Sequence, residues 1–223
     1  MKAIALFCLL TFTLCSCAQT DTILLKRAET LLQNTSTSVS EILSDKKYLP
    51  LHPETSFREL IKKHSTTDIL KIVTNDEPGK EIKIIGIIKN KSGQPVEGAL
   101  TYLYQTDAKG WYAADAPHVQ GNEGDHRHAR LFGYVKTDKN GKFELHTIKP
   151  SGYPKSDLPA HIHVQIVANG YQLYGTEFLF DDDERLVGQI RENSIKNRFL
   201  IGKPEKTTSP FDQQFTYNIS LEE

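Results

Sequence analysis

Two histidines separated by a single residue carry the clearest chemical pattern in this sequence. They are His161 and His163, in the segment Pro159-Ala160-His161-Ile162-His163. In a β-strand, residues two apart point to the same face, and their Cα atoms lie about 6.5 to 7 Å apart. Both imidazoles could then bind one metal ion, while Ile162 would face the opposite side. The alternative is a pair of half-exposed strand histidines that bind nothing.

Two tyrosines lie in segments that favour loops. Tyr153 stands between Gly152 and Pro154, shortly before the histidines, and Tyr112 follows Gly110 and a tryptophan. Taken singly, each tyrosine is more simply explained by packing, because tyrosine is common in cores and at their rims.

Taken together, the two tyrosines and two histidines predict a ferric site. A phenolate is a hard oxygen donor, and a metal ion must lower the pKa of the phenol far below its usual value of about 10 before it binds ionised. Fe(III) does this well, and two anionic oxygens favour the ferric over the ferrous state. Zinc and copper sites more often use thiols, carboxylates or a third histidine.

The region that must position these side chains has the pattern of β-strands. Residues 82–88 are apolar on both faces, as in a strand inside a sandwich. Asn140-Gly141 can take the positive φ angles of a tight type I′ hairpin turn, and Asn169-Gly170 separates two further strands. Strands are expected at 82–88, 99–105, 131–136, 142–147, 161–168, 171–180 and 215–221. Tight turns without intervening helices predict a mainly β fold, an antiparallel β-sandwich over residues 80–223.

Residues 17–79 are expected to form a linker and a small helical segment. Apolar residues recur at helical spacing from 23 to 32, and Thr55 or Ser56 could cap a second helix over 57–61. Thr67-Asp68 could begin another short helix. These helices would pack on the main domain or lead to it from a membrane anchor.

Residues 1–16 resemble the signal peptide of a bacterial lipoprotein. Lys2 is followed by an apolar run over 3–14, which is too short to span a bilayer. Leu14-Cys15-Ser16-Cys17 resembles a lipobox, with cleavage before Cys17 and lipid attachment to its thiol. The predicted location is the bacterial cell envelope, with membrane contact through that lipid. Ordinary secretion into the periplasm or beyond, with cleavage near Ala18, is the alternative.

Composition excludes several classes of site and partner. All three cysteines lie in the leader, so no disulfide framework and no cysteine-based zinc site is expected. The formal net charge is −1 and no long basic block is present, so nucleic acid is not an expected partner.

Five short segments follow one another in a characteristic order: Gly93-Gln94-Pro95-Val96-Glu97-Gly98-Ala99, Leu103 to Tyr112, Thr137-Asp138 with Gly141-Lys142-Phe143, Thr147 to Pro154, and Pro159 to His163. In sequence and order they resemble the catalytic domain of the intradiol ring-cleaving dioxygenases, the family of the catechol and protocatechuate dioxygenases. The resemblance covers about 140 residues, and its Tyr-Pro and Pro-Ala-His-x-His motifs are specific.

The resemblance implies a β-sandwich that binds Fe(III) through Tyr112, Tyr153, His161 and His163. Tyr112 and the histidines would remain on the iron, while Tyr153 would leave when a catechol-type substrate binds. The bound aromatic ring would then react with O2 and open between its hydroxylated carbons. Iron would act as a Lewis acid, with phenolates as proton acceptors.

Two positions depart from the family pattern and are expected to border the substrate pocket. Leu158 stands where the pattern has an arginine, three residues before the first histidine, and would begin the histidine strand. Glu177 stands where it has a glutamine. Loss of the guanidinium, with a carboxylate near an anionic substrate, predicts slow turnover or an unusual substrate. Arg127 or Arg130 could replace the missing cation.

Other polar clusters have simpler explanations. A segment with three histidines and an aspartate could bind a second metal ion, although a solvated loop explains it as well: His118, Asp125, His126 and His128. Asp181-Asp182-Asp183 is expected to be an exposed turn rather than a calcium site.

Three functions remain open from the sequence. The first is a lipid-anchored ferric intradiol dioxygenase acting on a catechol-type compound. The second is a weakly active or inactive envelope protein of the same fold that binds iron, catechols or ferric catecholates, which Leu158 and Glu177 favour. The third is a transthyretin-like accessory module, which would have no reason to keep the two tyrosines and His-x-His.

Overall fold

The computed structural model describes residues 20–113, 129–208 and 210–223. Residues 20–33 are helical. The elements that follow are α2 (Val39–Ser44), the 3₁₀-helix η1 (Lys46–Leu51), α3 (Thr55–Lys63), β1 (Leu70–Lys71), β2 (Glu81–Asn90), β3 (Leu100–Gln105), β4 (Leu131–Lys136), β5 (Lys142–Ile148), β6 (His161–Val167), β7 (Tyr174–Phe180), α4 (Gly188–Lys196), β8 (Leu200–Gly202) and β9 (Gln213–Leu221).

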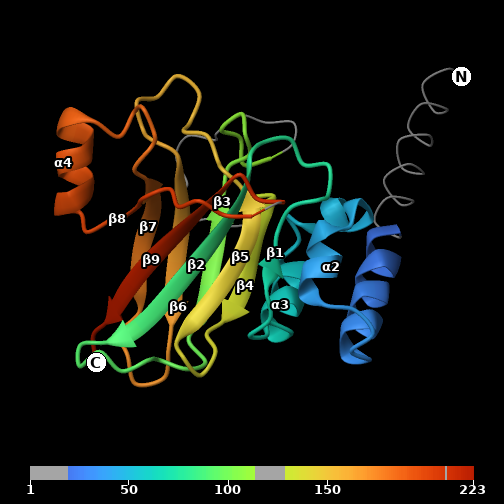
Figure 1. Ribbon diagram of the computed structural model, residues 1–223. Helices are drawn as coiled ribbons and strands as arrows, with labels where there is room; N and C mark the ends of the chain where they lie inside the picture. Colours follow the sequence, from blue (N-terminus) through green and yellow to red (C-terminus); the bar gives the residue numbers. More distant parts are fainter. Residues whose placement is uncertain (1–19, 114–128, 209) are drawn as a thin grey trace, which may run out of the picture.

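Two sheets face each other and form a β-sandwich (Figure 1). One sheet has the strand order β1-β5-β2-β9, and the other has β4-β3-β6-β7-β8. The predicted mainly β sandwich is confirmed, but the pairing is not wholly antiparallel. β1 pairs with β5, β2 with β9 and β7 with β8 in parallel, so both sheets are mixed.

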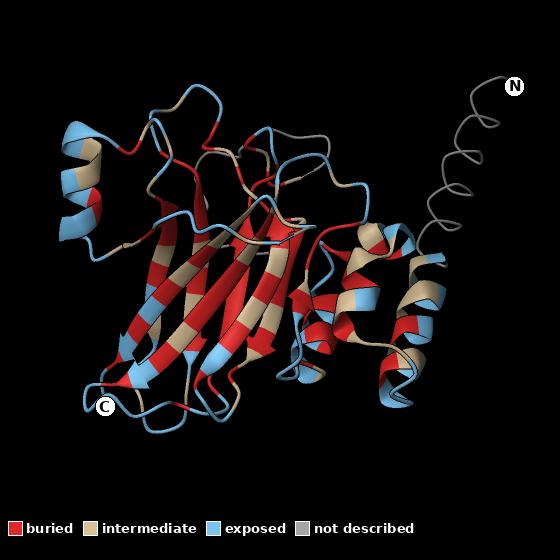
Figure 2. Cartoon of the chain, in the orientation of Figure 1, coloured by how far each residue is buried: buried red, intermediate tan, exposed pale blue. Residues whose placement is uncertain are grey.

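The core lies between the sheets, where large aromatic side chains interlock. Phe178 of β7 stacks on Tyr217 of β9 at 4.0 Å between ring centroids, and Phe180 meets Phe215 edge-on at 4.9 Å. All four rings are buried, and buried positions alternate with more exposed ones along β9 (Figure 2). This alternation arises because successive strand side chains point to opposite faces.

The N-terminal helices pack beside β4 and β1 (Figure 1). Arg58 of α3 fixes this contact: its guanidinium lies 3.7 Å from the centroid of the Phe132 ring and donates a hydrogen bond to the Tyr102 hydroxyl at 3.1 Å. The predicted helix at Thr67-Asp68 is wrong. The chain there bends into the short strand β1, whose backbone pairs with β5.

Three local predictions also differ from the structure. The predicted hairpin of residues 131–136 and 142–147 is wrong, because β4 and β5 belong to different sheets. The loop between them is not a type I′ turn either, because Gly141 has a positive φ and Asn140 does not. The Asp138 carboxylate accepts hydrogen bonds from the backbone N–H groups of Asn140 and Lys142, which stabilises another turn. In addition, the helix α4 lies between β7 and β8, where the sequence pattern predicted no helix.

Candidate metal centre

His161 and His163 lie side by side at the start of β6, on the same face of the strand. Their ring centroids are 4.7 Å apart. Ile162 between them is fully buried in the sandwich core. The strand therefore presents two imidazoles in one direction, as the spacing of two residues requires.

The two tyrosines come from loops that are tied to each other. Ser151 donates its backbone N–H to the Asp107 carbonyl at 3.1 Å, and its own carbonyl accepts the Thr106 hydroxyl at 2.7 Å. Gly110 has a φ of +81°, and a Cβ there would lie 2.3 Å from the carbonyl oxygen of Gly152. Glycine at position 110 thus permits both the turn and the close approach of the Tyr112 and Tyr153 loops.

Four donor atoms converge between these loops and β6. The Tyr112 and Tyr153 hydroxyl oxygens are 2.6 Å apart, and Nε2 of His163 lies 2.9 Å from the Tyr112 oxygen. Nε2 of His161 lies 3.1 Å from the Tyr153 oxygen. The structure therefore brings together the four residues that the sequence singled out. Two phenols that can become anionic and two neutral imidazoles suit a hard trivalent cation such as Fe(III).

The protein alone favours the neutral form of Tyr112. Burial raises the pKa of Tyr112 above its ordinary value, and the neighbouring Tyr153 raises that pKa further. Two buried phenols in contact cannot both ionise without a compensating positive charge. A cation bound between them would supply that charge, so this donor set is chemically suited to a metal ion.

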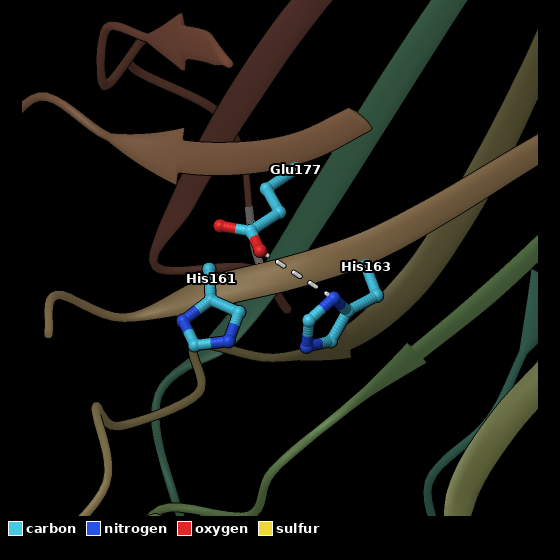
Figure 3. A group of neighbouring side chains, drawn as sticks. All are labelled: His161, His163 and Glu177. Atoms are coloured by element: carbon cyan, nitrogen blue, oxygen red, sulfur yellow. Dashed lines mark ion pairs between the residues drawn. The ribbon is translucent and has the colours of Figure 1, made fainter. Parts of the chain in front are cut away.

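In each histidine Nε2 faces a tyrosine, and the other, outer nitrogen is Nδ1. The two Nδ1 atoms have different partners. Nδ1 of His161 lies 2.8 Å from the carbonyl oxygen of Pro159. Because a carbonyl can only accept, Nδ1 carries the proton, and the lone pair of Nε2 points towards Tyr153. Nδ1 of His163 faces instead the carboxylate of Glu177 at 3.6 Å (Figure 3). These two histidines and Glu177 form a group whose possible ligand atoms all lie within 4.8 Å of one another.

Leu158 lies in an exposed loop, whereas Glu177 lies on a strand next to the histidines. Leu158 is 49% exposed and lies in the loop before β6, so the expectation that it begins the strand is wrong. Its carbonyl accepts a hydrogen bond from Arg185 at 3.3 Å. Glu177 lies directly across from His163 on β7.

Arg130, one of the two candidate replacements for the arginine of the family pattern, pairs with acidic side chains. Its guanidinium forms two hydrogen bonds with the Glu77 carboxylate, at 2.6 and 2.7 Å, and lies 3.5 Å from Asp107. Arg127 lies outside the described residues, as do the polar cluster His118, Asp125, His126 and His128, and the lipidation candidate Cys17.

The three aspartates after β7 each bind protein groups. Asp181 pairs with Arg191 at 2.6 Å and Asp182 with Lys149 at 2.7 Å. Asp183 accepts the backbone N–H of Ala160 at 2.9 Å, next to His161. These contacts explain the run of acidic residues without a calcium ion.

Tyr104 is a site residue that the sequence pattern did not single out. Its ring stacks on the imidazole of His163, with centroids 4.5 Å apart and planes 12° apart. In the strand pattern it resembles any other apolar position of 99–105. Only the pairing of β3 with β6, which places Tyr104 opposite His163, reveals the contact.

Comparisons with known proteins agree on one family. Residues 55–223 match a family model described as dioxygenase. The chlorocatechol 1,2-dioxygenase of Rhodococcus opacus is 29% identical over 128 residues, which are 50% of this chain and 48% of that protein. The chain spans about half the length, or less, of the curated relatives it matches.

Solved structures agree on the fold. The dioxygenase domain of a dioxygenase and carbohydrate-binding fusion from Streptomyces sp. SirexAA-E superposes with a TM-score of 0.53 at 23% identity, over 71% of this chain and 89% of that chain. An Acinetobacter catechol 1,2-dioxygenase superposes with a TM-score of 0.55 at 19% identity, over 70% of this chain and 57% of that chain.

Proposed function

The chain belongs to the intradiol ring-cleavage dioxygenase family, and from this premise we propose that it is a non-haem Fe(III) dioxygenase that opens a catechol-type ring with O2. The convergence of Tyr112, Tyr153, His161 and His163 supports this proposal most directly. The relatives it matches include a chlorocatechol, a catechol and a 6-chlorohydroxyquinol 1,2-dioxygenase. A catechol-type ring is therefore the proposed substrate class.

Each side chain of the centre has a role in this proposal. A ferric ion held at this centre would supply a Lewis acid that withdraws charge from a bound aromatic ring. Tyr112, His161 and His163 would hold it, and the Tyr153 phenolate would accept a proton from an incoming catechol hydroxyl at its Oη. The Pro159 carbonyl keeps His161 in the tautomer whose Nε2 faces the centre. Both oxygen atoms of O2 would enter the product, which carries two new carboxyl groups.

Colour and oxygen consumption test the proposal. Tyrosinate bound to Fe(III) absorbs visible light, so the protein loaded with Fe(III) should be red to purple, and a ferric chelator or dithionite should bleach it. Tyr112→Phe and Tyr153→Phe should each weaken or shift this band, whereas the control Tyr171→Phe should leave it unchanged. A colourless protein filled with zinc would contradict the iron assignment.

The reaction itself is tested with a panel of catechols. Uptake of one O2 per ring, with both labelled oxygen atoms recovered in a ring-opened dicarboxylic acid, is the expected outcome. Oxygen uptake without incorporation into the product would point to a different oxidation and would contradict the proposed function.

A second candidate function is capture of catechols or ferric catecholates without cleavage. Leu158 at the position of the family's arginine favours it, because an apolar side chain cannot stabilise the negative charge that develops on the ring. Arg130, one of the two candidate substitutes, is held by Glu77 and Asp107. A substrate-induced shift of the visible band without oxygen uptake would identify this function.

A further inference from the structure

His163 lies in the middle of a row of three side chains that crosses three adjacent strands. In the strand register, His163 of β6 pairs with Tyr104 of β3 on one side and with Glu177 of β7 on the other. Directly paired residues of antiparallel strands point to the same face, with their Cβ atoms about 4.5 to 5.5 Å apart. The backbone therefore places an aromatic ring and a carboxylate on either side of this imidazole.

Each part of the imidazole has a separate neighbour. Nε2 faces the hydroxyl oxygens of Tyr112 and Tyr153, at 2.9 and 3.5 Å. The ring face lies against Tyr104. Nδ1 faces the carboxylate of Glu177 at 3.6 Å (Figure 3). This arrangement leaves Nε2 as the nitrogen available to a metal ion at the centre.

The two histidines of the centre therefore differ in charge environment. His161 has a neutral backbone carbonyl at its outer nitrogen, whereas His163 has an anion. The Glu177 oxygen lies beyond ordinary hydrogen-bond length from Nδ1, so it acts on the imidazole through its negative charge, which increases the basicity of the ring as a donor. The side chains of His163 and Glu177 are only 17% and 24% exposed, so solvent screens this pair incompletely.

We propose that Glu177 is a positioning residue for His163, and that its charge favours Fe(III) over Fe(II) at this centre. The proposal rests on the proposed iron site. Two phenolates leave one uncompensated positive charge on a ferric ion, and the Glu177 carboxylate offsets it. After reduction the same carboxylate would be an excess negative charge beside a low-dielectric site, so it opposes reduction. A glutamine at this position, as in the family pattern, would orient the imidazole without that charge.

The test compares wild type with Glu177→Gln, Glu177→Asp and the control Glu192→Gln, which removes an exposed carboxylate on α4. The midpoint potential of the iron and the affinity for Fe(III) in chelator competition are measured, together with the visible band. Outer partners of metal ligands typically change metal affinity by about tenfold to a hundredfold. Glu177→Gln should lower the preference for Fe(III) over Fe(II) by about tenfold, which is a rise of about 59 mV for one electron.

The remaining outcomes are distinct. Glu177→Asp should retain most of the wild-type potential, and it also provides a charged variant if the Gln protein does not fold. Equal potentials in Glu177→Gln and Glu192→Gln would overturn the inference. Complete loss of iron from Glu177→Gln, equal to that of His163→Ala, would make Glu177 a direct ligand and would also overturn it. Absence of a tyrosinate band in the wild type would instead reject the proposed function.

Discussion

In the proposed enzyme, Leu158 stands where the family pattern has an arginine next to the substrate ring. The residue lies three positions before His161, is half exposed, and is anchored by its backbone to Arg185. Strand β7, which pairs with the histidine strand β6, carries the carboxylate of Glu177 next to His163. The charge that develops on a substrate ring during oxygen attack would therefore have less cationic stabilisation than in the family pattern.

The double variant Leu158→Arg with Glu177→Gln should raise catechol cleavage by about tenfold or more, because about 1.4 kcal/mol of barrier corresponds to tenfold in rate. The measurement is kcat for oxygen uptake, with iron content determined in parallel. Wild type should show weak cleavage of catechol and protocatechuate, although both should shift the visible band. A double variant that binds iron but gains no activity would favour the function of capture without cleavage.

The contact between the Tyr112 loop and the Tyr153 loop positions the two phenol oxygens of the metal centre. These loops meet at Gly110 and Gly152, and their hydrogen bonds hold the phenol oxygens together. Gly93 provides a matched comparison, because it has a similar positive φ of +80° but no atom within 4 Å of an added Cβ.

Gly110→Ala should disrupt the metal centre, whereas Gly93→Ala should only destabilise the fold. Both variants force alanine into the left-handed region, at a cost of about 1 to 2 kcal/mol. Only Gly110→Ala also pushes a methyl group into the backbone of the Tyr153 loop. The visible band should therefore weaken in Gly110→Ala and persist in Gly93→Ala, with thermal unfolding measured for both. Equal bands in the two proteins would show that the loop contact does not control the site.

The N-terminal helices are joined to the sandwich through the buried His52. Its ring stacks on Phe57 of α3 at 5.4 Å, and its Nδ1 donates to the Arg130 carbonyl at 2.7 Å. Its Nε2 has no hydrogen-bond partner among the residues that the structure describes. Burial lowers the pKa of His52 to about 4, so the ring is neutral at pH 7.

This histidine should make the protein less stable in mild acid. The unfolded chain binds the His52 proton near pH 6.5, whereas the folded chain binds it only near pH 4. The unfolded state therefore holds more protons between these values, and the free energy of unfolding falls as the pH drops through that window, by up to about 3 kcal/mol. His52→Phe should remove this part of the pH dependence in urea unfolding. An unchanged dependence would assign it to other groups.

At the scale of the whole molecule, the location of the protein in the cell stays a prediction. No helix among the described residues is long and apolar enough to cross a membrane. The predicted attachment to the membrane rests on a lipid at Cys17, which lies outside the described residues. A single acyl chain binds membranes only marginally, so stable anchoring needs more than one chain.

Cys17→Ser should release the protein from the membrane fraction or block its processing, because the lipid acceptor is lost. Fractionation of the producing cells, followed by mass spectrometry of the mature N-terminus, measures both effects. The control is Cys15→Ser, which keeps the acceptor thiol. Wild-type protein that is soluble and begins after Ala18 would establish ordinary secretion.

The periodicity of the sequence was sufficient to predict a β-sandwich and two imidazoles on one face of a strand. The strands at 131–136 and 142–147, and the shared face of His161 and His163, follow from a period of two residues, which is a local property of the chain. The family was recognisable for a similar reason, since its motifs are short and occur in a fixed order.

The groups that surround the side chains of the metal centre are apparent only from the three-dimensional structure. The parallel pairings of β1 with β5 and of β2 with β9 join segments far apart in the chain. The helix α4 lies between β7 and β8, where the strand pattern predicted none. Arg130 is held by Glu77, and His163 stacks on Tyr104, because segments distant in sequence meet there. Residue types and their spacing can identify the donor atoms of a site. The charged groups around each donor depend on long-range packing, which cannot be read from local periodicity.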